Sequence, residues 1–223
     1  MQSILIKSEM DSRAILYPLM KVLGQFNQSL IVSRNETLSR FIEGEFDGYY
    51  KNLRIIIDPQ GNTDDIINDY NVNIEDYDFI IYDNVGTIDF DYILVPISEY
   101  VTDWFYNEIT YMDINKVTFI LFGKASKSNI KEKIEQSLKE QQEADEFESE
   151  AAIHKSDSKS QLKDKTSKLV PMKFPTMEEI EKFESQGVMY NANSTLIKLF
   201  YNIFKDSIGL TESQFISGVN RSK

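Results

Sequence analysis

The sequence predicts an α/β domain with three layers around a doubly wound, mostly parallel sheet of about seven strands. The first observation behind this prediction is a set of short apolar runs that are too continuous for half-exposed strands, a pattern typical of strands covered on both faces. The second is that helix-like stretches separate most of these runs, and such alternation implies βαβ crossovers. The third is size, because 223 residues with 41% hydrophobic composition favour one sizeable core over two large domains.

Seven apolar runs are the predicted strands. They are residues 3–7 (SILIK), 29–33 (SLIVS), 53–58 (LRIIID), 78–83 (DFIIYD), 91–96 (DYILVP), 116–122 (KVTFILF) and 169–173 (LVPMK). The first helix follows the first strand. Asp11 or Ser12 can cap its N-terminus, and we expect it to run to Gly24 with a kink at Pro18.

The composition divides the chain into three parts. Residues 1–123 hold six of the strands and form an α/β core. Residues 124–168 are rich in Lys, Glu, Gln and Ser, which predicts an insertion made of a charged, solvated helix and a flexible linker. Residues 169–223 return to globular composition, and we expect their strand and helices to complete the same domain.

Two helices are predicted in this last part. Thr176 can cap the helix that begins MEEIEKF, and Asn193 or Ser194 can cap the final helix. The apolar residues of the final helix fall on one face, namely Leu196, Leu199, Phe200, Ile203 and Phe204. We expect this face to pack against the sheet.

The lack of cysteine and the single histidine exclude several kinds of metal site and catalytic site. The chain has no cysteine, which excludes disulfides, thiolate zinc sites and cysteine nucleophiles and fits a reducing compartment. Its single histidine, His154, falls in the predicted linker, so neither a His-rich metal site nor a Ser-His-Asp arrangement is expected. No apolar run reaches 18 residues and the N-terminus lacks a signal-peptide pattern. The sequence therefore predicts a cytoplasmic protein without a transmembrane segment.

The formal net charge is −12 at pH 7. This charge disfavours general binding to nucleic-acid phosphates and to anionic lipid. Peripheral contact with a membrane is therefore expected only through protein partners.

Two segments carry a family resemblance. In DFIIYDNVG, four apolar residues end in Asp83, and Gly86 follows three residues later. The block from residue 169 has a short strand, a helix, Gly187 and a long terminal helix. On these features the chain resembles the ParA/MinD family of P-loop ATPases over nearly its whole length, the charged insertion excepted. The resemblance implies a P-loop NTPase-like fold with a nucleotide-binding-like core in residues 1–123. It places Asp83 where the family's aspartate supports magnesium and its water, and Gly86 in the adjacent switch turn.

The first motif of that family, K-G-G-x-G-K-T/S, aligns with KSEMDSRA but departs from it. Ser8, Glu9 and Asp11 stand at the glycine positions, Ser12 stands at the P-loop lysine and Arg13 at the magnesium-binding hydroxyl. Close backbone approach to a phosphate needs glycine, and the two carboxylates would repel a triphosphate. The sequence therefore predicts that the phosphate site is abolished.

The degenerate nucleotide-site positions are Lys7, Ser12, Arg13, Asp83 and Gly86. Lys7 aligns with the signature lysine, which reaches across a dimer interface in this family. Arg13 is the one remaining cation that could substitute for the P-loop lysine. No catalytic residue, metal ligand or cofactor is expected, and the alternative is that ATP and magnesium still bind.

A further tract, IIIDPQGN at residues 55–62, matches the family's D-x-D-P-Q-G-N motif almost literally. It follows the third predicted strand, whereas the family carries this motif after the second. The expected place holds IVSRN, where Ser33 and Asn35 replace the two carboxylates. Either the match is a turn sequence, which we favour, or the second strand is an insertion.

Three functions are compatible with these features. We favour a ParA/MinD-like pseudo-ATPase that acts by protein-protein contacts in positioning or assembling a larger machine, of the partition, pilus or secretion type. Such a protein would work with protein partners, as a homodimer or as a heterodimer with an intact ATPase. The second function is slow ATP turnover through Lys7, Arg13 and Asp83. The third is an unrelated doubly wound binding domain with its ligand at the strand ends, near Asp58, Asp83 and Asn84.

Overall fold

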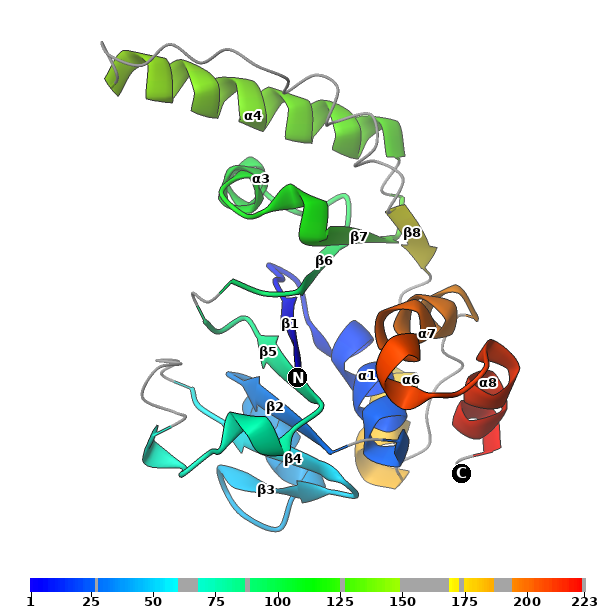
Figure 1. The fold of residues 1–223 in the computed structure, drawn as a ribbon. Coiled ribbons are helices and arrows are strands. Elements are labelled where there is room, and N and C mark those ends of the chain that lie inside the picture. The colour runs from blue at the N-terminus through cyan, green and yellow to red at the C-terminus, as the bar shows by residue number, and fades with distance from the viewer. Residues whose placement is uncertain are drawn as a thin grey trace.

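A computed structural model describes residues 1–26, 28–59, 68–86, 89–124, 127–148, 169–172, 175–186 and 194–221. The fold is α/β, with a single eight-stranded sheet in the order β3-β4-β2-β5-β1-β6-β7-β8 (Figure 1). The strands are β1 (Gln2–Ile6), β2 (Ser29–Ser33), β3 (Asp47–Tyr50), β4 (Leu53–Ile57), β5 (Phe79–Asp83), β6 (Tyr92–Ile97), β7 (Val117–Phe122) and β8 (Leu169–Met172).

The sheet is parallel except at one edge. β1 lies near its centre, and Ile4 of β1 is in register with Ile81 of β5 on one side and with Tyr92 of β6 on the other. Only β3 runs antiparallel, paired with β4. Because parallel neighbours end at the same edge, the carboxyl ends of β1, β2, β5 and β6 lie together.

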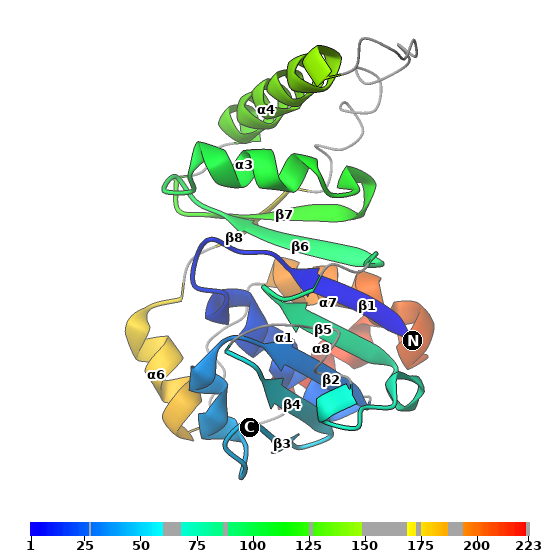
Figure 2. The same cartoon turned by 90° about the vertical axis from the view of Figure 1, so that its left-hand side faces the viewer.

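Helices cover both faces of the sheet (Figures 1 and 2). The first face carries α1 (Arg13–Phe26), α6 (Met177–Gln186), α7 (Ser194–Ile208) and α8 (Glu212–Arg221). The second carries α3 (Asp103–Thr110), with α4 (Lys127–Glu148) on its outer side. Short 3-10 turns are formed by η1 (Glu36–Phe41), η2 (Ile74–Asp76) and η3 (Ile114–Lys116). We call the two faces the α1 face and the α3 face.

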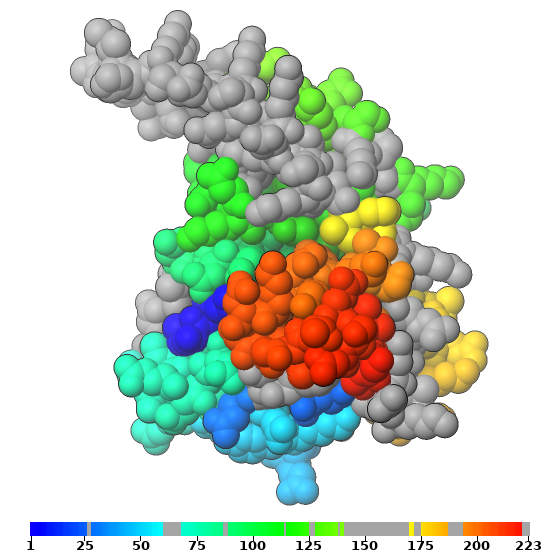
Figure 3. All heavy atoms as spheres, turned by 45° about the vertical axis from the view of Figure 1, so that its right-hand side comes forward, coloured from blue at the N-terminus to red at the C-terminus, as the bar shows by residue number. Residues whose placement is uncertain are grey.

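The alternation of side chains along each strand builds a separate hydrophobic core on each face. In β1, Ile4 and Ile6 are buried in the α1 face, whereas Leu5 is buried in the α3 face. Aromatic rings anchor the helices, and the ring of Phe204 in α7 lies edge-on to Phe79 of β5, with 4.5 Å between centroids. In the space-filling view, α7 and α8 form one continuous covering (Figure 3).

All seven predicted strands are confirmed to within one residue at each end. The number of strands was too low, because β3 was not predicted. Its sequence DGYY contains Asp and Gly, which are rare in strands. β3 exists through its pairing with β4, where Arg54 binds both carboxylate oxygens of Asp47 at 2.9 and 2.7 Å. Gly48 is also required there, because a Cβ would lie 2.8 Å from the Cβ of Ile42.

The helix boundaries agree with the predicted caps in most places. α1 begins at Arg13, whose backbone N–H donates to Asp11 at 3.0 Å, and it ends two residues beyond the predicted Gly24, with Pro18 inside it. Thr176 caps α6 in a reciprocal box with Glu179. The final predicted helix, STLIKLFYNIFKDSIG, matches α7, which ends before Gly209 at φ +63°. A further helix, α8, follows it and was not predicted.

The predicted insertion begins with α4, which packs against α3 through Ile130 and Ile134. The predicted linker and His154 lie outside the described residues, as do Gly187 and residues 60–67, which include most of the DPQGN tract. β8 pairs with β7 in the same sheet as the core strands. β2, whose five residues are all buried, is an interior strand between β4 and β5. Across the described ranges, no helix is both long and apolar enough to cross a bilayer.

Candidate functional site at the carboxyl edge of the sheet

The order in which the chain adds strands to the sheet reverses at β1. After β1 it passes through α1, on the α1 face, to β2 on one side of the strand. After β5 it continues on the other side of β1 with β6, which leads into α3 on the α3 face. The connections that leave the neighbouring strands β1 and β6 therefore diverge, and such a switch point opens a crevice at the carboxyl ends of parallel strands.

In the turn after β1, backbone N–H groups donate hydrogen bonds to side chains of the turn itself and of Asn84. The N–H of Ser8 donates to Oδ1 of Asn84 at 2.7 Å, and the N–H of Met10 donates to Oγ of Ser8 at 3.0 Å. The N–H of Arg13 is taken by Asp11. A phosphate-binding turn would direct such groups outward at the anion. Here three of them are already engaged.

Asp83 ends β5 beneath this turn and is only 2% exposed. Its Oδ2 accepts a 2.6 Å hydrogen bond from the hydroxyl of Ser33, whereas its buried Oδ1 has no hydrogen-bond partner within the described residues. Burial raises the pKa of the Asp83 carboxyl, and the hydroxyls of Ser33 and Ser12 oppose that shift only in part. Asp83 and Ser12 thus lie close together on the α1 face.

Arg13 is not a free cation. Asp11 accepts two hydrogen bonds from its Nε, and Glu184 of α6 accepts one from its Nη1 at 3.0 Å. The hydrogen bond to Asp11, with that to Glu184, raises the pKa of the guanidinium further above its ordinary value despite burial. A phosphate would have to displace two carboxylates from Arg13.

Glu184 is the centre of this network and its side chain is 5% exposed. It also accepts a hydrogen bond from the hydroxyl of buried Tyr17 at 2.7 Å and one from Arg40 at 2.5 Å. Burial favours the neutral form of Glu184, but the hydrogen bonds from Tyr17 and Arg13 outweigh it and lower its pKa. We call Asp11, Arg13, Tyr17, Arg40 and Glu184 the Glu184 cluster.

Lys7 and Gly86 occupy two other places. The side chain of Lys7 lies on the α3 face, where it forms an ion pair with Glu108 of α3. Strand alternation explains this, because Leu5 and Lys7 point to the same face while Ile6 points to the other. Gly86 has φ +100°, a backbone conformation that favours glycine, just beyond Asp83. The structure thus brings Ser12 and Asp83 together and places Lys7 on the opposite face.

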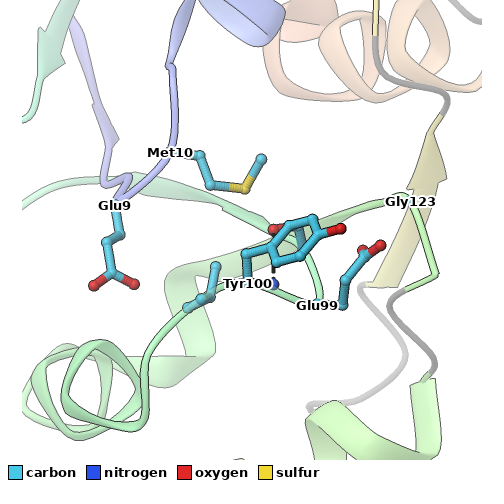
Figure 4. Close-up of a pocket in the computed structure, with 7 residues that line it drawn as sticks. Glu9, Met10, Glu99, Tyr100 and Gly123 are labelled. Atoms are coloured by element: carbon cyan, nitrogen blue, oxygen red, sulfur yellow. Dashed lines mark hydrogen bonds between the residues drawn. The ribbon is translucent and has the colours of Figure 1, made fainter.

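A pocket with a volume of about 510 Å³ opens at the switch point (Figure 4). We call it the switch-point pocket, and its lining consists of Glu9, Met10, Ser98, Glu99, Tyr100, Val101 and Gly123. These residues come from the turn after β1, the loop between β6 and α3, and the end of β7. Figure 4 shows the Tyr100 ring standing between Met10 and Glu99.

Both glutamates of the switch-point pocket are held by hydrogen bonds from neutral groups. Glu9 accepts from the N–H and the hydroxyl of Thr102, the N-cap of α3, at 2.7 and 2.6 Å. Glu99 accepts from the N–H of Lys124 at 3.0 Å, and hydrogen bonds from its own N–H and from Lys124 lower its pKa. Gly123, at φ +65°, permits this approach, since a Cβ there would lie 2.4 Å from Oε2 of Glu99.

Glu99, Tyr100 and Glu184 were not predicted as site residues from the sequence. For the first two a signal was present, because SEY directly follows the predicted strand DYILVP at the same edge as Asp83. For Glu184 the signal was its position four residues after Ile180, on the buried side of the helix.

The residues present do not fit a magnesium-triphosphate group. The turn is acidic, its N–H groups at Ser8, Met10 and Arg13 are engaged, and the guanidinium of Arg13 is held by Asp11 and Glu184. Asp83 offers one buried oxygen, Oδ1, that has no hydrogen-bond partner among the described residues.

Comparisons with protein-family models, with curated proteins and with solved structures give no match for this chain.

Proposed function

We propose that this chain is a catalytically degenerate, ParA/MinD-like protein of the P-loop NTPase type. It acts in the cytoplasm by protein-protein contacts, in positioning or assembling a larger machine of the partition, pilus or secretion type. It does so as a homodimer or beside an intact ATPase. The family part of this proposal rests on the sequence motifs around Asp83 and in the C-terminal block.

The observation that carries the loss of ATPase chemistry is the turn after β1. Its N–H groups at Ser8, Met10 and Arg13 are bound by side chains, and the guanidinium of Arg13 is held by Asp11 and Glu184. A triphosphate would have to break these bonds and approach two carboxylates, which costs free energy that no glycine nest repays. Contacts with other proteins remain as the way for such a fold to act.

Weak binding of ATP and magnesium is the second candidate. A buried carboxylate with one oxygen unpartnered is costly to stability, and buried charges of this kind cluster at functional sites. Asp83 sits at the strand end where a magnesium-supporting carboxylate is expected from the resemblance. This candidate would use Asp83 with Lys7 and Arg13.

Calorimetric titration of the full chain with ATP and magnesium separates the two candidates. We expect no saturable heat for the wild type at ATP concentrations up to about 1 mM, which corresponds to binding weaker than about 4 kcal/mol. Asp83→Asn and Arg13→Ala should behave like the wild type. Saturable binding of ATP in this range that is lost in either variant would establish the second candidate instead.

A further inference from the structure

An exposed aromatic side chain lines the switch-point pocket. Tyr100 is 84% exposed, and Trp104, which follows three residues after the lining residue Val101 in the first turn of α3, is 68% exposed. Such exposure means that neither ring contributes much to the core, and Tyr and Trp are the residue types that most often anchor protein interfaces. The position of Tyr100 in the pocket lining indicates a binding role.

The pocket places two carboxylates, those of Glu9 and Glu99, beside the Tyr100 ring. The carboxylate of Glu99 is held in place by backbone N–H groups, and that of Glu9 by Thr102. Among the described side chains, none forms an ion pair with either glutamate, although the charge of Lys124 acts on Glu99 from beyond ion-pair distance. Lys7 and Lys133 are paired with Glu108 and Asp103. The hydrogen-bond donors to both carboxylates are neutral, so these hydrogen bonds add no positive charge.

The third feature is apolar surface between the charges. Met10 packs partly against both cores, and Val101, which also lines the pocket, is buried. A ligand that suits this lining needs an apolar stem and a cationic, planar head. Arginine has three methylenes and a guanidinium that stacks on aromatic rings and binds carboxylates.

We propose that the switch-point pocket binds an arginine side chain of a partner protein. The guanidinium stacks on Tyr100 and binds Glu99, and the methylenes contact Met10 and Val101. A volume of about 510 Å³ leaves room for the side chain and its flanking backbone. This inference rests on the proposed function, because it supplies the chemistry of the partner that the protein recognises.

The single tryptophan of the chain, Trp104, is a built-in fluorescent reporter. The test is a titration of the full chain with the blocked tripeptide acetyl-Gly-Arg-Gly-amide, followed by Trp104 fluorescence. The same peptide with citrulline, which is neutral and nearly isosteric, is the ligand control. We expect a saturable change with the arginine peptide, with a Kd of about 1 mM or tighter, and no saturable change with the citrulline peptide.

Matched variants locate the binding. Tyr100→Ala should weaken the affinity at least tenfold, whereas Tyr111→Ala, at the other end of α3 and 74% exposed, should leave it unchanged. Glu99→Gln should also weaken it at least tenfold. Glu75→Gln removes the same charge from the opposite edge of the sheet, before β5, and should have no effect. Thermal unfolding of each variant confirms that the fold is kept.

The inference is overturned if the wild type gives no saturable change up to about 10 mM peptide, or if the citrulline peptide binds equally well. It is also overturned if either pocket variant binds as tightly as its control. The proposed function fails by a different result, saturable ATP binding, so the two failures are distinguishable.

Discussion

At the carboxyl edge of the sheet, the acidic side chains on the α1 face form ion pairs, whereas those of the pocket next to α3 do not. On the α1 side, Glu184 is nearly buried and is bound by Arg13, Arg40 and Tyr17, so that opposite charges compensate one another. On the α3 side, Glu9 and Glu99 border an open pocket and receive hydrogen bonds only from neutral groups. Carboxylates that form ion pairs within the chain hold the fold together, whereas carboxylates that border open space without an ion pair are available to a ligand.

The difference has a structural origin. α6 returns from a distant part of the sequence and closes the α1 side by packing on α1, with Phe183 stacked near Tyr17 at 4.9 Å between ring centroids. On the α3 side, α3 begins directly after the β6 loop. The crevice at the switch point is therefore covered by α6 on the α1 face and open at the switch-point pocket next to α3.

The largest effect on stability is expected when the Glu184 cluster on the α1 face is disrupted. Glu184→Ala leaves the guanidinium of Arg13 and the hydroxyl of buried Tyr17 without their shared acceptor, and should lower the free energy of unfolding by roughly 2 to 4 kcal/mol. Urea unfolding at pH 7 measures this change.

The matched control is Glu178→Ala in the same helix. Glu178 forms an ion pair with Lys182, and both side chains are more than half exposed, so its loss should change the free energy of unfolding much less than Glu184→Ala does. Equal losses in the two variants would show that the Glu184 cluster is not what closes this side.

A smaller effect of opposite sign is expected at Asp83. Asp83→Asn keeps an acceptor for the Ser33 hydroxyl and removes a buried charge, so it should raise the free energy of unfolding at pH 7 by about 1 to 2 kcal/mol. Because burial raises the folded pKa of Asp83, the cost of its charge is present above that pKa. The gain should therefore shrink as the pH falls through it.

Asp206→Asn, on an exposed position of α7, is the control for this prediction and should leave the free energy of unfolding at pH 7 nearly unchanged. A loss of stability in Asp83→Asn would mean that the charge of Asp83 is compensated in the folded protein. A gain would mean that the carboxylate is kept at the expense of stability, as is common for functional positions.

The fold was largely predictable because buried parallel strands leave a strong local signal. Each apolar run of the core, such as SLIVS in β2, could be found without knowledge of its neighbours. β3 could not, because its four residues are held by a hairpin and by the Arg54–Asp47 ion pair rather than by intrinsic strand preference. The family resemblance remains a prediction.

The candidate site was predictable only where it lies next to strand ends. Asp83 could be named because it ends an apolar run, and the acidic turn after β1 could be read directly. The partners of Arg13 could not be named in full, since Glu184 is 171 residues away and is one of several glutamates in α6. Long-range pairs of this kind follow from packing and leave no local pattern.

The central claim is that the turn after β1 keeps its backbone N–H groups for its own side chains. Amide NMR spectra of the full chain, recorded with and without magnesium and ATP at about 1 mM, a concentration that detects even weak binding, test it directly. We predict that the amide resonances of Ser8, Met10 and Arg13 do not move, because Asn84, Ser8 and Asp11 already bind them. A saturable shift of these three resonances would contradict the account and show that the turn opens to a phosphate.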